Sequence, residues 1–166
     1  MYDGGTFCHV EQSALRSTLH SAKTNRELSV VLDTFDRKAW ADCILHCDQW
    51  LVLTNDQLSQ NPRAQDNIIE IREAAQIAYH NNEYLKADLE YEFVRALQHV
   101  KKVEEILKRR EQAPEVRTDL SEIPDNIPQI YFQLFTKINI MNTYGEAGRQ
   151  ILAESRRVSG YEPKYT

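Results

Sequence analysis

The sequence has few of the residues that all-β and disulfide-stabilised proteins require. Its 166 residues include only five glycines and five prolines, too few for the many tight turns of a sheet protein. The three cysteines are an odd number, and no Asn-x-Ser/Thr glycosylation site is present. We therefore expect no disulfide framework and an intracellular, reducing environment.

Two kinds of partner are disfavoured by features that the sequence does not contain. No apolar run reaches the roughly 18–20 residues of a membrane-spanning helix, so we expect no membrane partner. The N-terminal segment has no basic stretch followed by an apolar core, so we expect no secretory signal. A net charge of −5 disfavours nucleic acid as the main partner.

Apolar residues recur every three or four positions along most of the chain, which predicts an all-α fold. N-terminal helices are expected within residues 1–35. A helix boundary is expected at Asn61-Pro62, because asparagine caps helices and proline fits a first helical turn. An acidic stretch with prolines predicts a linker or insert over about 112–128. The last expected segments are helices over about 129–142 and 144–157 and a polar tail over 158–166.

The double asparagine at positions 81 and 82 predicts the turn of a helical hairpin. Asparagine tolerates the left-handed conformation that ends many helices, so Asn82 is expected to stop one helix. Ala75 and Ala78, before the turn, are small enough to let two helices approach closely. The residues expected to face them after the turn are Tyr84, Ala87 and Tyr91.

Related residues recur at fixed shifts, which indicates internal repeats. Residues similar to those of this hairpin occur about 60 positions later, in a second hairpin. Others occur about 34 positions earlier, in a degenerate hairpin around Trp50. The sequence thus predicts three antiparallel hairpins over residues 36–157, stacked as a short α-solenoid. The residues expected to pack the last hairpin are Ile138, Asn142, Tyr144, Ala147 and Ile151.

The run AYHNNEYLKADLEYEFV resembles the centre of a tetratricopeptide repeat, and NTYGEAGRQI repeats the match. The first unit departs from the family pattern, because Leu53 replaces the small alanine. The wider layout is similar to the N-terminal tetratricopeptide regions of anaphase-promoting complex subunits. This resemblance implies a non-enzymatic scaffold of a cell-cycle ubiquitin ligase, found in nucleus and cytoplasm. Such a scaffold homodimerises and stacks on other helical-repeat subunits of its complex.

Dense apolar residues in the first third of the chain predict either core packing or a homodimer interface, where aromatic anchors contribute most. The candidate interface residues are Phe35, Trp40, Ile44, Trp50 and Leu51. We expect the chain to associate with itself.

One cluster of residues invites a chemical interpretation. Cys43, His46 and Cys47 lie within one helical turn of each other and could share a metal ion. Zinc sites normally take ligands from two separated pairs, however, so buried structural cysteines are expected, with no metal, cofactor or catalytic residue. Two alternatives to the scaffold stay open: an acidic all-α inhibitor or immunity-type protein that masks a partner enzyme, and a metal-dependent helical enzyme built on this cluster.

Overall fold

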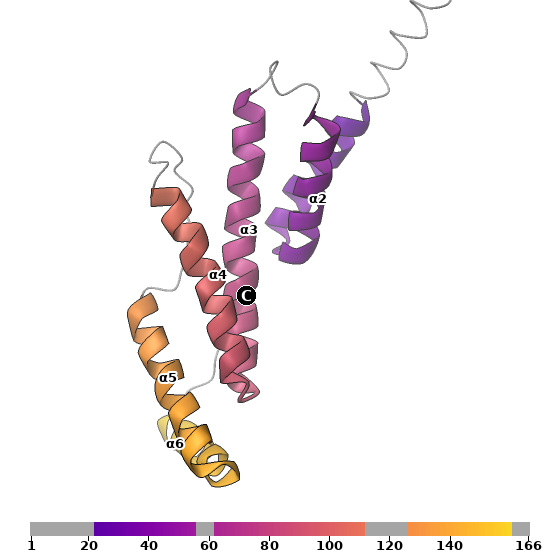
Figure 1. Ribbon diagram of the computed structural model, residues 1–166. Coiled ribbons are helices and arrows are strands. Elements are labelled where there is room, and N and C mark those ends of the chain that lie inside the picture. The colour runs from indigo at the N-terminus through magenta and orange to yellow at the C-terminus, as the bar shows by residue number, and fades with distance from the viewer. Residues whose placement is uncertain (1–21, 56–61, 112–125, 161–166) are drawn as a thin grey trace, which may run out of the picture. The chain divides into compact units, whose positions relative to one another are not determined.

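The computed structural model describes residues 22–55, 62–111 and 126–160, and every regular element in these ranges is a helix (Figure 1). The predicted all-α class is therefore confirmed. The predicted first helix, residues 112–125 of the predicted insert and the last residues of the predicted tail lie outside the described ranges. The chain divides into two compact units, Met1–Arg72 and Glu73–Thr166.

In the described part of the first unit, a helix over residues 22–36 is followed by α2, Trp40–Leu53. Lys38 adopts a left-handed conformation between them, with φ of 59°. The N–H groups of Lys38 and Ala39 donate to the carbonyls of Phe35 and Thr34, the pattern of a Schellman helix end. The degenerate first hairpin was predicted wrongly, because α2 continues without a turn through the residues around Trp50.

α3, Pro62–Leu89, is the longest helix in the described ranges and begins at Pro62, as predicted. It runs without interruption through Asn81 and Asn82, so the predicted turn at Asn82 is wrong. An asparagine inside a helix costs only about 0.7 kcal/mol relative to alanine. Asn82 is buried, and the packing of the residues around it outweighs that local cost.

The chain turns seven residues later, after Leu89. Tyr91 has a left-handed φ of 62°, and the N–H groups of Tyr91 and Glu92 donate to the carbonyls of Asp88 and Ala87. This is a second Schellman end. Tyr91 was predicted on the packing face of a helix, but it is the turn residue itself.

In the second unit, α4, Phe93–Glu111, runs back alongside the end of α3 (Figure 1). One small core cluster between them holds Ile77, Val103 and Ile106. A larger cluster joins α3 and α4 to the last two helices, α5 (Ile127–Tyr144) and α6 (Glu146–Ser159). Its buried members are Ala87, Phe93, Ala96, Leu97, Val100 and Leu134.

α5 and α6 form the one predicted hairpin that the structure contains near its expected place. The turn is at Gly145, with φ of 56° and ψ of −129°, and not at Asn142, which lies inside α5. Gly148 provides the close approach that was predicted for Ala147: a Cβ there would lie 2.6 Å from the carbonyl oxygen of Ile140. α5 packs against both α4 and α6.

Candidate functional site

Some of the residues predicted to pack helical hairpins are buried in the structure and others are exposed. Ala75, Ala78 and Ala87 are fully buried, and Tyr84 and Ile138 pack partly buried against the larger core cluster. The other predicted packing residues of the last hairpin are solvent-exposed, because Gly148 and Leu152 face α5 in their place. These exposed residues are Asn142, Tyr144, Ala147 and Ile151.

Two of the five candidate dimer residues are buried in the first unit, and the other three are half-buried. Trp40 and Trp50 are only 8% and 5% exposed, so neither can anchor a second molecule without unfolding its surroundings. The ring of Phe35 meets that of Trp40 edge-to-face at 5.5 Å. Ile44 and Leu51 are half-buried. The interface prediction is therefore wrong for the two tryptophans, and core packing is the role that the structure gives them.

The side chains of Cys43, His46 and Cys47 do not meet at one point that could hold a metal ion. Cys43 and Cys47 are both fully buried, and contact with Cys43 together with burial raises the pKa of the Cys47 thiol. His46 turns to the carboxylate of Glu27 on the preceding helix. Within the described ranges, no group of three or more His, Cys, Asp or Glu side chains is placed to hold a metal ion.

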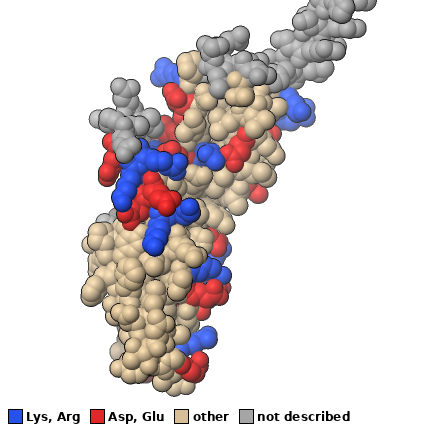
Figure 2. Space-filling view, in the orientation of Figure 1, with Lys and Arg blue, Asp and Glu red and all other residues tan. Residues whose placement is uncertain are grey.

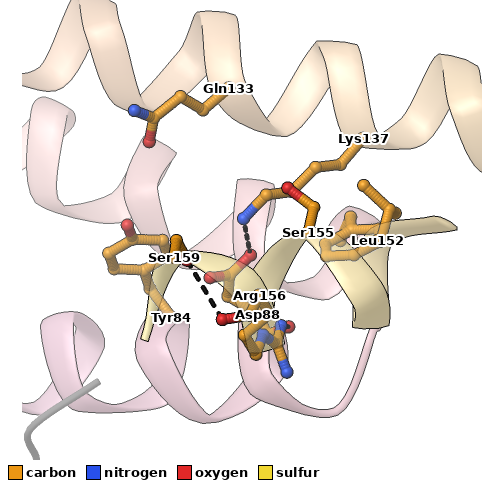
Figure 3. Close-up of a pocket in the computed structure, with 9 residues that line it drawn as sticks. Tyr84, Asp88, Gln133, Lys137, Leu152, Ser155, Arg156 and Ser159 are labelled. Atoms are coloured by element: carbon orange, nitrogen blue, oxygen red, sulfur yellow. Dashed lines mark hydrogen bonds and ion pairs between the residues drawn. The ribbon is translucent and has the colours of Figure 1, made fainter. Parts of the chain in front are cut away.

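A polar pocket of about 370 Å³ lies in the second unit, where the end of α3 meets α5 and α6 (Figure 3). Asp88, only 4% exposed, lies in its wall. Lys137 of α5 donates from Nζ to Asp88 Oδ1 at 2.7 Å. Arg156 of α6 donates to the carbonyls of Asp88 and Leu89, each at 3.0 Å. These carbonyls belong to the end of α3, where a helix has unpaired acceptors and a partial negative charge.

Aromatic rings also contact Lys137 and Arg156, together with a third cation, Arg149. The guanidinium groups of Arg149 and Arg156 lie 4.9 and 4.6 Å from the ring centre of Tyr91, and Lys137 lies 5.5 Å from that of Phe93. Cations this close to an aromatic face are attracted to it. The side chains of Lys137 and Arg156 are therefore committed to partners within the unit. These hydrogen bonds and ring contacts fix α5 and α6 to the end of α3, and we call them the clamp.

The outer surface of α5 has a different character. Lys137 is the only charged residue of the whole helix, and its ammonium group is paired with Asp88. None of the exposed residues of α5 is charged. Phe132 is 72% exposed and Phe135 is 50% exposed, one helical turn apart. Figure 2 shows the surface over α5 almost free of acidic and basic side chains. We call Phe132, Phe135 and the other exposed residues of α5, all of them uncharged, the α5 face.

The contrast with α4 shows that the α5 face is unusual. The exposed positions over the second half of α4 carry charges, as expected for a helix whose outer side meets water. These are Lys101, Lys102, Glu105, Lys108, Arg109 and Glu111. Depletion of charge together with exposed aromatic rings is the composition of the core of a protein–protein interface.

The sequence carried a signal for this face that the repeat analysis did not use. The segment IPQIYFQLFTKINIMNTY has four bulky apolar residues besides those that pack in the core cluster: Phe132, Phe135, Ile140 and Tyr144. No family model, curated protein or solved structure matches the chain. None of the helices in the described ranges combines the length and the hydropathy needed to cross a bilayer.

Proposed function

We propose that this chain is a non-enzymatic protein-interaction module, and that the α5 face is its binding surface. The observation that carries the proposal is the pair of exposed rings, Phe132 and Phe135, on a helix whose exposed residues are all uncharged. Aromatic side chains in a charge-poor surface contribute most of the binding free energy in typical interfaces.

The partner that we propose is a second copy of the same chain. The chain carries a net charge of −5, so two copies repel each other weakly as whole molecules. The α5 face is a region where two copies can meet without placing like charges opposite each other. A two-fold axis through it would bring the phenylalanines of each copy against those of the other, which is the self-complementary arrangement of most homodimers.

The test is the mass of the protein in solution, measured by light scattering over a range of concentrations. We expect the wild type to be dimeric at about ten micromolar and above. The double variant Phe132→Asp/Phe135→Asp is expected to be monomeric, because it places two acids from each copy at the contact. Val94→Asp is the matched control: Val94 is also exposed, and an acid near the start of α4 is electrostatically favourable.

A monomeric wild type over this range would reject self-association. If the wild type is monomeric but captures a different protein through the α5 face, and the double variant loses that protein, the interaction module stands with another partner. If both variants behave as the wild type does, the α5 face has no binding role.

The narrower prediction, an N-terminal region of an anaphase-promoting complex subunit such as subunit seven, has lost much of its support. It rested on hairpins that recur at about 34 and 60 residues, and the helix ends after Leu89 and Tyr144 do not follow those intervals. We keep only the coarser proposal of a helical interaction module. The acidic inhibitor is less favoured, because acids and bases alternate on the charged side of α4 in pairs such as Lys102–Glu105 and Lys108–Glu104.

A further inference from the structure

Two histidines from different helices meet inside the second unit. His80 lies on α3 and His99 on α4, and their Nδ1 atoms are 2.9 Å apart. The ring centres are 5.2 Å apart with the planes tilted by 38°, and both side chains are half-buried. Two imidazole nitrogens at this distance must share a proton: one ring donates it and the other accepts with its lone pair. The contact therefore requires that at least one ring be neutral.

The surroundings of the pair contain charges of both signs. His80 faces His99, Lys102 and Glu105 from α4 and Glu83 from its own helix, and the edge of Tyr79 meets its ring at 5.2 Å. The charged groups that act on His99 are Glu83 of α3 and Arg95 of its own helix. Burial is the largest effect on both rings, and it lowers the pKa of both histidines below the ordinary value.

We propose that the His80–His99 pair is a pH-sensitive latch between α3 and α4, closed by the shared proton at neutral pH and opened when both rings are protonated. A single added proton leaves an N–H donor and a neutral acceptor, so the hydrogen bond survives. The second proton removes the acceptor and places two positive charges side by side. The two protonation steps belong to the pair and not to either ring alone.

The histidine pair lies close to the small core cluster between α3 and α4, so separation of the two rings affects this cluster. Ile77 and Ile106, three residues before His80 and seven after His99, belong to the small core cluster between α3 and α4. His80 and Ile106 also line a pocket of about 610 Å³ on this side of the unit. Separation of the two rings is expected to loosen this cluster first and to expose its apolar side chains.

The sign of the effect follows from proton binding. Histidines in the unfolded chain titrate near pH 6.5, whereas the folded pair titrates lower. Between these values the unfolded state binds more protons, so stability falls as the pH falls. The contribution of the latch is complete above about pH 6.5 and is lost in acid.

The direct test is an NMR titration of the histidine ring signals in the wild-type protein. We expect His80 and His99 to titrate below pH 6.5 with mutually dependent curves. Independent titration of His80 and His99 at the ordinary value would overturn the proposal. This measurement needs no substitution, so its outcome does not depend on whether a variant folds.

A second test compares thermal unfolding at pH 7.5 and pH 5.5 in the wild type and in His80→Gln/His99→Gln. The glutamines retain hydrogen-bonding groups but do not titrate. We expect the wild type to lose about 4 °C more in Tm than the double variant over this interval. An equal loss in the wild type and the double variant would show that the pair is not the sensor.

Discussion

Single residues decide how two of the helices end, and neither residue is a glycine. Lys38 and Tyr91 both hold a left-handed φ, a conformation that costs most side chains about 1 kcal/mol. At both sites the N–H groups that follow satisfy carbonyls of the last helical turn. The two residues differ in what their side chains do, since Lys38 is exposed while Tyr91 packs against Phe93 and two arginines.

This difference predicts opposite effects of the same substitution. Lys38→Gly should raise the free energy of unfolding by about 0.5–1 kcal/mol, because glycine adopts this conformation without steric cost. Tyr91→Gly should lower it by about 1–2 kcal/mol, because the lost contacts of the ring with Phe93, Arg149 and Arg156 outweigh the relief. Urea unfolding of both variants measures these changes. A stabilised Tyr91→Gly would mean that the ring contributes little to the clamp at the end of α3.

At the scale of the elements, much of the helical pattern is predictable from the sequence and the turns are not. The all-α class, the start of α3 at Pro62 and the existence of α5 and α6 follow from apolar periodicity and proline chemistry. The stretch Leu89–Phe93 contains no glycine, proline or asparagine, so no local signal marks the turn there. The hydrogen bonds of the Schellman end join backbone atoms, which every residue has, so residue types alone do not predict them.

The candidate site shows the same limit. Apolar density around Trp40 and Trp50 predicted either a core or an interface, and only the pairing of α2 with the preceding helix decides between them. The exposure of Phe132 and Phe135 depends on which side of α5 meets α4 and α6. That choice is made by contacts between distant parts of the chain, and a periodic pattern in one helix does not contain it.

The continuity of α3 is open to a test with a clear sign. If Asn82 lies inside a helix, Asn82→Gly should lower the free energy of unfolding by about 0.5 kcal/mol or more, because glycine is the poorer helix former and the buried amide is lost. If Asn82 instead held a left-handed turn, glycine would fit it better and the protein would gain stability. Circular dichroism during urea unfolding gives the direction. A stabilised variant would restore the hairpin interpretation of this segment.

At the scale of the whole chain, each of the two units has its own buried side chains. In the first unit the buried side chains come from the helix over residues 22–36, α2 and the start of α3, and they include both tryptophans of the chain. In the second unit the two core clusters contain no tryptophan. Tryptophan fluorescence therefore reports on the first unit alone, whereas circular dichroism reports on the helices of both.

This separation makes Gly148→Ala informative beyond its own helix. The new Cβ would lie 2.6 Å from the backbone oxygen of Ile140, so α5 and α6 must move apart, at a cost of about 1–3 kcal/mol. We expect the circular dichroism transition in urea to shift to lower concentration while the tryptophan fluorescence midpoint stays at its wild-type value. Gly160→Ala, where a Cβ has no neighbour within 4 Å, is the control and should cost only the strain of a left-handed alanine. If instead both signals shift together in Gly148→Ala, the two units unfold in one cooperative transition.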